Sequence, residues 1–173
     1  AIDLLKQVIN LNNGIYLEEE LKGTSSTKFC AGVAGYPEKH FEAPNMQTDL
    51  LYLKKKVDAG AEYVVTQMFF DNKKFFAFEK QCREAGITVP IIPGLKPITT
   101  KKQMTVIPRT FYVDIPTDLS GELLKCKDDA DVEKVGTEWL LAQSKELKAA
   151  GVPVLHYYTL GKPHVVCNVV REL

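Results

Sequence analysis

The 173-residue sequence lacks an excess of charge of either sign, because 22 basic residues balance 22 acidic ones. Such a chain has no net field to attract nucleic acid or an anionic membrane, so neither is expected as a partner. It also lacks an apolar run near the roughly 20 residues that span a bilayer. The hydrophobic content of 45% is nevertheless enough for one buried core. These features predict one domain's worth of chain in the cytoplasm.

Several chemical motifs are missing too. The four cysteines stand far apart without a C-x-x-C pair, which predicts reduced and mostly buried thiols. His156 and His164 are too isolated to indicate a metal site, so no metal is predicted. No G-x-G-x-x-G fingerprint and no P-loop is present, which excludes the common glycine-rich phosphate-binding loops.

Short apolar segments alternate with helical patterns along the chain. Four segments read as strands buried on both faces, at residues 28–35, 63–68, 89–93 and 153–158. Helical patterns lie at about 50–57, at 75–82, from near Thr99, and at 129–150. Three helices are each predicted to end in an Ala-Gly pair just before the next strand. This rhythm predicts an α/β fold with a parallel sheet.

Two architectures fit this alternation. The chain is either a complete small open α/β sheet or half of a (β/α)8 barrel, because a whole barrel needs about 250 residues. Helical sequence before the first strand and after the last favours the parallel-stranded half of a (β/α)8 TIM barrel, with about four βα units.

Polar side chains gather where the first predicted strand ends. The Tyr36-Pro37 pair ends the apolar run, because proline removes a backbone donor and disfavours helix in the residue before it. The loop that follows presents Glu38 and His40. Folds of this class bind their ligands at the carboxyl ends of the strands.

Two further features each leave two interpretations open. Asp49, Tyr52 and Lys56 share one face of a helix, which is either a solvated charged face or a rail for a phosphate or ribose. Gln67 lies in an otherwise apolar strand, as a core amide or as an amide that points into a pocket. His156 and Tyr158 share a face of the last strand, where a structural role is expected for His156. From the residues alone, a half-barrel that binds a phosphate-bearing ligand without redox catalysis is one outcome.

Five motifs in a fixed order carry a resemblance. They are Ala-Gly-Tyr-Pro-Glu-Lys-His at 34–40, the segment 49–61, Thr-Gln followed by Phe-Phe-Asp within 66–71, Pro-Ile-Ile-Pro-Gly at 90–94, and His-Tyr-Tyr-Thr-Leu at 156–160. As a set they resemble methylenetetrahydrofolate reductase of the bacterial type. The resemblance implies a barrel that contains FAD and uses NADH or NADPH to reduce 5,10-methylenetetrahydrofolate to 5-methyltetrahydrofolate.

Matched position by position, the resemblance implies two groups of site residues. The FAD contacts are Tyr36, His40, Asp49, Tyr52, Lys55, Lys56 and Tyr158. The folate contacts are Gln67, Gln103 and Lys162. Gly161 and Lys162 stand where relatives usually carry Asn and often Arg.

The resemblance also indicates what the chain does not contain. The proton-donating Glu of the family lies on the first barrel strand, and the Asp that tunes the flavin lies in a loop after the fourth. The match here begins just before the fifth strand, so residues 1–173 are expected to be a single partial domain, the C-terminal half of the barrel. No catalytic residue is therefore assigned, and the chain alone is expected to be inactive. A half-barrel with open edges is also expected to form a homo-oligomer.

Overall fold

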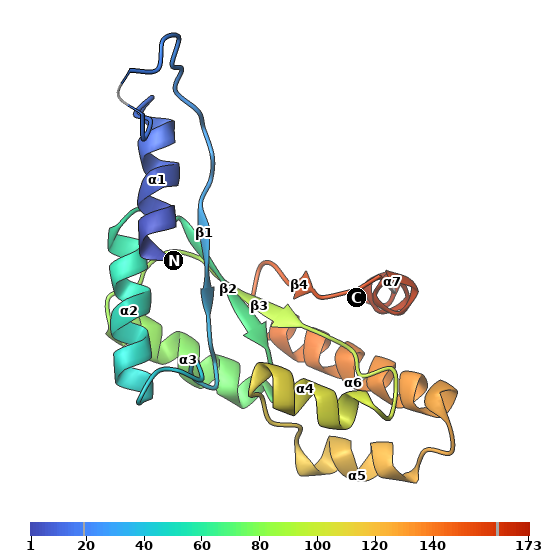
Figure 1. The fold of residues 1–173 in the computed structure, drawn as a ribbon. Helices are drawn as coiled ribbons and strands as arrows, with labels where there is room; N and C mark the ends of the chain where they lie inside the picture. Colours follow the sequence, from blue (N-terminus) through green and yellow to red (C-terminus); the bar gives the residue numbers. More distant parts are fainter. Residues whose placement is uncertain (19, 162) are drawn as a thin grey trace.

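Helices and strands alternate along most of the described chain, and three successive helices separate β3 from β4. The computed structural model describes residues 1–18, 20–161 and 163–173 (Figure 1). The elements in order are α1 (Ile2–Asn12), β1 (Gly32–Gly35), α2 (Met46–Asp58), β2 (Tyr63–Met68), α3 (Asn72–Glu84), β3 (Ile91–Leu95), α4 (Gln103–Phe111), α5 (Thr117–Lys125), α6 (Asp129–Ala149), β4 (His156–Tyr157) and α7 (Pro163–Arg171).

The four strands form one parallel sheet in the order β1-β2-β3-β4. Each strand pairs with its neighbour in the chain, and right-handed crossovers in such an order place the connecting helices on one face. Helices α4 and α5 lie at the end toward which the strands point (Figure 1). This arrangement confirms the predicted α/β fold with four parallel strands, as expected for part of a (β/α)8 barrel.

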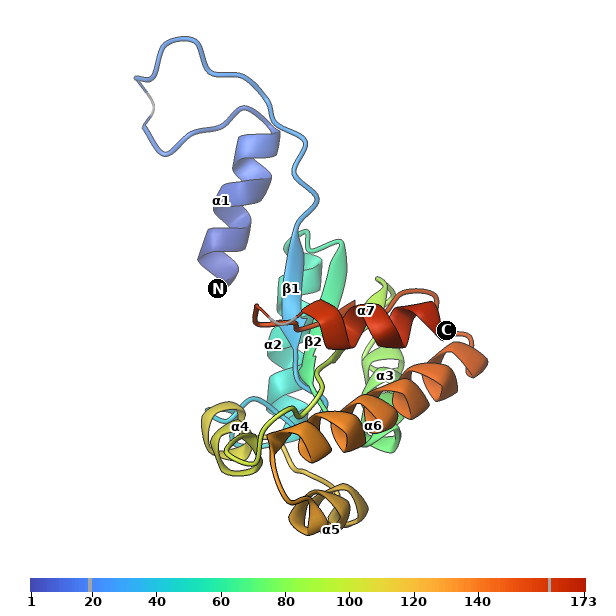
Figure 2. The ribbon, with the colours of Figure 1, turned by 90° about the vertical axis from the view of Figure 1, so that its right-hand side faces the viewer.

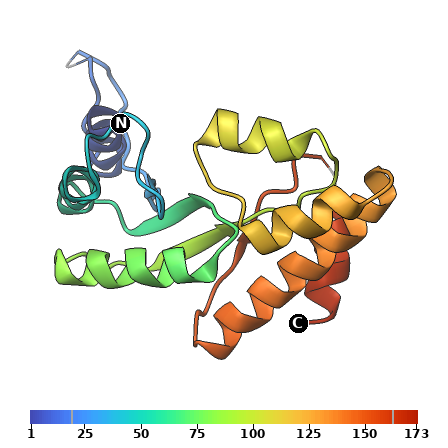
Figure 3. The ribbon, with the colours of Figure 1, turned by 90° about the horizontal axis from the view of Figure 1, so that it is seen from below.

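Two large clusters of buried side chains hold helices α2 to α7 against the sheet. In the first, residues of α2, α3, α6 and α7 pack on Val64, Ile91 and Leu95 of the strands. Helices α6 and α7 lie side by side in this layer (Figures 2 and 3). In the second, Met68 and Phe70 pack against residues of α4, α5 and α6. The second cluster therefore fixes the carboxyl end of the sheet, where ligand loops are expected.

The three predicted Ala-Gly helix stops are confirmed. The C-cap residues of helices α2, α3 and α6 are Ala59, Ala85 and Ala150. Each is followed by a glycine with positive φ, at 110°, 77° and 86° for Gly60, Gly86 and Gly151. This left-handed conformation is open to glycine at little cost, so the sequence marks these ends clearly.

Other expectations were wrong in detail. Strand β1 begins at Gly32 rather than residue 28, β3 is shifted to Ile91–Leu95, and β4 is reduced to two residues. Helix α4 begins at Gln103 rather than near Thr99, and the sequence pattern does not predict α5. The thiols also differ from the prediction, because Cys82 and Cys126 are buried whereas Cys30 and Cys167 are exposed.

Strand β2 is not buried on both faces as predicted. Val64, Thr66 and Met68 are buried, whereas Tyr63, Val65 and Gln67 alternate with them and are only half-buried. The first set faces the helices, and nothing among the described residues fully covers the second set. We call the face that carries Tyr63, Val65 and Gln67 the open face. Among the described helices, none combines the length and apolar character that crossing a bilayer requires.

We expect this chain to self-associate through its sheet. Strands β1 and β4 are the edges, and unpaired edges beside a half-buried apolar face favour pairing with another chain. Sedimentation velocity over a range of concentrations should show species larger than a monomer. Val65→Lys on the open face should reduce their proportion, whereas Gln47→Lys on the exposed surface of α2 should not. A monomer at every concentration would contradict the expectation.

Candidate functional site

The loop after β1 is held in shape by its own polar groups. The backbone amide of His40 donates to Asp49 Oδ2 of α2 at 2.8 Å. Lys39 has a left-handed backbone with φ of 76°, and its ammonium donates to the carbonyls of His40 and Ala43 at 2.9 and 2.6 Å. A non-glycine residue in this conformation needs local contacts to compensate, which these bonds supply. The loop is therefore a fixed part of the site.

Two tyrosines at the strand ends define the rim of the sheet. The Tyr36 ring meets the His40 ring edge to face, with 4.6 Å between centroids. Tyr158 follows β4, and its hydroxyl donates to the Thr66 carbonyl of β2 at 2.9 Å. Burial raises the pKa of both phenols, with a further contribution from Asp49 to Tyr36 and from Tyr36 to Tyr158. Both therefore stay protonated at neutral pH. The Tyr36 hydroxyl can donate a hydrogen bond to a ligand, whereas Tyr158 uses its one proton on Thr66 and can only accept.

Lys56 brings a cation to the same rim. Its ammonium donates to the Ala34 carbonyl on β1 at 2.9 Å. Burial lowers the pKa of Lys56, and the charge of Asp49 opposes this effect. Asp49 and Lys56 therefore act on each other across two turns of α2, as their shared face predicted. The ammonium has further N–H donors for an anion.

Gln67 points its amide away from the helix layer. It lies on the open face, and its Oε1 accepts from the Met68 amide at 2.9 Å. Among the described residues, its Nε2 has no acceptor. The sequence suggested an amide that both donates and accepts toward a ligand. Here the carbonyl is used within the strand, so the side chain presents donors.

The remaining predicted site residues lie less centrally. Gln103 begins α4, and its Oε1 accepts from the Thr99 amide at 2.6 Å. Tyr52 and Lys55 are both exposed on α2 and contact each other, with the ammonium 5.0 Å from the ring centre. The predicted folate contact Lys162 lies outside the described residues. The cofactor and folate roles of all these side chains stay predictions.

A charged cluster that the sequence did not assign links two loops and helix α3 at this end of the sheet. Glu38, in the loop after β1, forms an ion pair with Lys74 of α3, and its Oε2 accepts from the Asp114 amide at 3.0 Å. Lys74 also donates to Asp114 Oδ2 at 2.6 Å. The Glu38 side chain is only 9% exposed, and its Oε1 has no partner among the described residues. The three residues are 36 to 76 positions apart, so no local pattern pointed to them.

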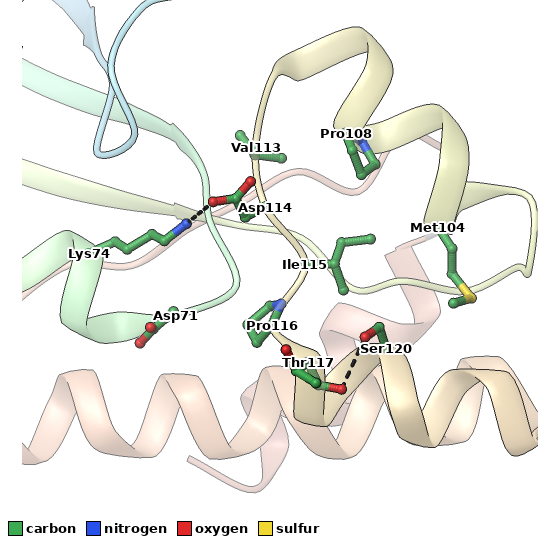
Figure 4. Close-up of a pocket in the computed structure, with 10 residues that line it drawn as sticks. All are labelled: Asp71, Lys74, Met104, Pro108, Val113, Asp114, Ile115, Pro116, Thr117 and Ser120. Carbon is green, nitrogen blue, oxygen red and sulfur yellow. Dashed lines mark hydrogen bonds and ion pairs between the residues drawn. The ribbon is translucent and has the colours of Figure 1, made fainter. Parts of the chain in front are cut away.

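The cluster borders a pocket of about 570 Å³ between α3, α4 and α5. Figure 4 shows Lys74 and Asp114 joined on one side of it, with Met104 and Pro108 of α4 on another. Its lining contains none of the predicted FAD or folate residues. The pocket is therefore separate from the rim formed by Tyr36, Lys56 and Tyr158.

The ionisation of Glu38 should make stability depend on pH. Burial raises the pKa of Glu38, and the hydrogen bond from Lys74 opposes this only in part. Because the folded pKa lies above the unfolded one, the folded chain loses its proton later as the pH rises. The free energy of unfolding therefore falls as the pH rises from the unfolded pKa of Glu38 to its folded pKa. The side chain of the Glu38→Gln variant cannot ionise. In urea unfolding, its free energy of unfolding should therefore rise relative to that of the parent chain between pH 4 and pH 7.

Asp114→Asn provides a control of opposite sign. The hydrogen bond from Lys74 lowers the pKa of Asp114, so its contribution is present above the unfolded pKa and is lost as the pH falls. The free energy of unfolding of the parent should exceed that of this variant most at neutral pH. The difference should be small, because the Asp114 side chain is 82% exposed. A Glu38→Gln difference that is constant with pH would contradict the assignment.

A parallel sheet with polar loops at its carboxyl ends is the arrangement that (β/α)-barrel proteins use to bind ligands. The family model described as "Methylenetetrahydrofolate reductase" matches residues 6–173. The chain belongs to the methylenetetrahydrofolate reductase family.

Known relatives show how much of that family the chain spans. It is 40% identical over 144 residues to the 5,10-methylenetetrahydrofolate reductase of Escherichia coli, which covers 81% of this chain and 49% of that protein. It is also 40% identical over 147 residues to a probable methylenetetrahydrofolate reductase (NADPH) of Caenorhabditis elegans, covering 84% of this chain and 22% of that protein. Bacterial and animal relatives match equally well, so the bacterial type stays a prediction.

A solved structure supports the fold. An uncharacterized protein from Clostridium thermocellum, described as binding two copies of 5-methyl-5,6,7,8-tetrahydrofolic acid, aligns with a TM-score of 0.52 at 18% identity. The alignment covers 80% of this chain and 50% of that one. At this identity the likeness concerns the fold alone.

Proposed function

We propose that the chain is the C-terminal half of a flavin-dependent barrel that reduces 5,10-methylenetetrahydrofolate to 5-methyltetrahydrofolate with NADH or NADPH. The observation that carries the proposal is the rim, where a cation, a carboxylate, an imidazole and two phenols lie at the carboxyl ends of the strands. Residues 1–173 would then be one partial domain, and the proton-donating Glu and flavin-tuning Asp would be supplied by another part of the barrel.

The chemistry of these groups fits FAD. The Lys56 ammonium suits the pyrophosphate, because a cation with several N–H donors binds phosphate oxygens well. Asp49 keeps one oxygen beyond the His40 amide and can accept from a hydroxyl. When bound, FAD supplies the hydride carrier between nicotinamide and folate. Tyr36, His40 and Tyr158 would shape the remainder of its site, with Tyr52 and Lys55 at the exposed edge.

Gln67 and Gln103 would serve the folate side. The Nε2 donors of Gln67 suit a carbonyl oxygen of a pterin or of a nicotinamide carboxamide. Lys162 is proposed as a third folate contact from its position in the sequence.

Titration of the purified chain tests the proposal. Binding of FAD should quench flavin fluorescence. Lys56→Met should weaken the affinity for FAD, whereas Lys80→Met on the exposed surface of α3 should not. One charge-assisted hydrogen bond is worth about 1.5–3 kcal/mol, or roughly 10- to 150-fold in affinity. Binding of AMP or ADP as tightly as FAD, with no flavin effect, would favour the alternative half-barrel that binds a phosphate-bearing ligand without redox chemistry.

A further inference from the structure

Helix α6 reaches the loop that follows β2 with two side chains. Trp139 Nε1 donates to the Phe70 carbonyl at 3.0 Å. Gln143 Nε2 lies 3.4 Å from the Phe69 carbonyl and 3.3 Å from Asn72 Oδ1. Phe69 and Phe70 are the two residues that follow the end of β2, and both of their side chains are buried. We call Trp139 and Gln143 the α6 clamp.

The geometry of α6 brings the clamp to the strand ends. Gly136, Trp139 and Gln143 are spaced i, i+3 and i+7, so they share one face of the helix. A Cβ on Gly136 would lie 1.9 Å from the Ile98 carbonyl, so the helix touches the backbone beyond β3. The same face of α6 therefore rests on the carboxyl ends of β2 and β3 together.

One member of the clamp, Gln143, is a buried polar residue, whereas Trp139 is half-buried and packs partly on apolar side chains. Gln143 is 5% exposed, and its Oε1 has no partner among the described residues. Burying an amide with one unsatisfied atom costs free energy that an apolar side chain would not. Asn72 Nδ2 donates to the backbone carbonyl of Gln143 at 3.1 Å, which joins the start of α3 to the same network.

Gln67 lies between two anchored points of the chain. On one side, Thr66 Oγ1 accepts from the Gly94 amide, and the Thr66 carbonyl accepts from Tyr158, both at 2.9 Å. On the other side, the clamp holds the carbonyls of Phe69 and Phe70. The Met68 amide, which donates to Gln67 Oε1, is therefore fixed from both directions.

We propose that Trp139 and Gln143 are positioning residues that fix the amide of Gln67 toward its ligand. The inference rests on the proposed role of Gln67 and adds two residues far from the rim in sequence. Loss of the clamp frees the peptides after β2, so the Gln67–Met68 contact opens more often and the Nε2 donors lose their direction.

Amide hydrogen exchange of the ligand-free chain, followed by NMR, tests the proposal independently of any ligand. Trp139→Phe keeps an aromatic ring and removes the donor. It should speed exchange of the Met68 amide by about tenfold, as loss of a hydrogen bond predicts. The Val64 amide, which donates to the Pro90 carbonyl, is the reference and should change little. Gln143→Leu should act in the same direction.

The control variant is Thr137→Val, which removes a hydrogen bond from α6 to its own Glu133 carbonyl and leaves the loop untouched. It should not alter Met68 exchange. Unchanged Met68 exchange in both clamp variants, or equal acceleration at Met68 and Val64, would overturn the positioning role.

A double-mutant cycle then measures the consequence for binding. Trp139→Phe should weaken the affinity of the chain for 5-methyltetrahydrofolate about three- to tenfold, and have no further effect in a Gln67→Ala background. An equal loss in both backgrounds would overturn the inference. If Gln67→Ala alone leaves the affinity unchanged, the proposed role of Gln67 fails. The exchange rate of the Met68 amide then still tests whether the clamp orders the Gln67 side chain.

Discussion

Gly136→Ala is expected to lower the free energy of unfolding by about 1–3 kcal/mol, the usual cost of overpacking a filled interior. The sign is unusual, because alanine in an unobstructed helix is more stable than glycine by about 0.5–1 kcal/mol. Here the added methyl group would sit 1.9 Å from the carbonyl oxygen of Ile98. A backbone carbonyl cannot turn away as a side chain can, so α6 must move and weaken its contacts with the sheet.

Gly121 of α5 is the matched control. A Cβ there meets nothing within 4 Å, so Gly121→Ala should raise stability by about 0.5–1 kcal/mol. Urea unfolding of the two variants beside the parent chain gives both values. Stabilisation by Gly136→Ala would show that α6 does not rest on the backbone at Ile98.

The second large effect concerns Gln67. In a complete barrel of the proposed function, with FAD bound, Gln67→Ala should weaken folate binding and slow reoxidation of the reduced flavin by methylenetetrahydrofolate. One lost hydrogen bond costs about 0.5–1.5 kcal/mol, and more where it strands a buried partner, so affinity should fall roughly 2- to 12-fold. FAD affinity should change little, because the proposed FAD contacts lie mainly in the preceding strand, loop and helix.

Stopped-flow absorbance of the flavin measures both the rate and the apparent affinity. Gln47→Ala on the exposed surface of α2 is the control and should behave as the parent enzyme. An unchanged rate and affinity in the Gln67 variant would refute its assignment. Residues 1–173 alone are expected to show no turnover, so robust reductase activity from them would mean that the proton donor lies within this chain.

Local signals in the sequence predicted most of the architecture. The Ala-Gly stops at Gly60, Gly86 and Gly151 could be recognised because glycine alone favours the positive φ found there. The Tyr36-Pro37 break likewise marks the end of β1. Helix α5 is hard to predict, because it lies between the weak pattern after Thr99 and the stronger one of α6 and has no side-chain N-cap.

Contacts between distant residues could not be predicted. The order of the motifs placed Tyr36, Gln67 and Tyr158 at strand ends, since the carboxyl ends of parallel strands meet at one edge. No local pattern predicts that Trp139 donates a hydrogen bond to Phe70, 69 positions away. The apolar residues of β2 predict burial on both faces, because composition cannot say whether a face is covered by another part of the chain.

The Ala-Gly helix stops have a consequence for how this fold can change over time. They lie at the end of the sheet where the strands begin, and there they fix short, regular turns with few alternatives in sequence. The loops at the other end carry the rim, the charged cluster and the pocket, and each is stabilised by its own contacts. Substitution at the ligand end can therefore proceed without disturbing the turns that set the order of the strands. Selection on ligand preference and selection on folding then act on different residues of the same βα units.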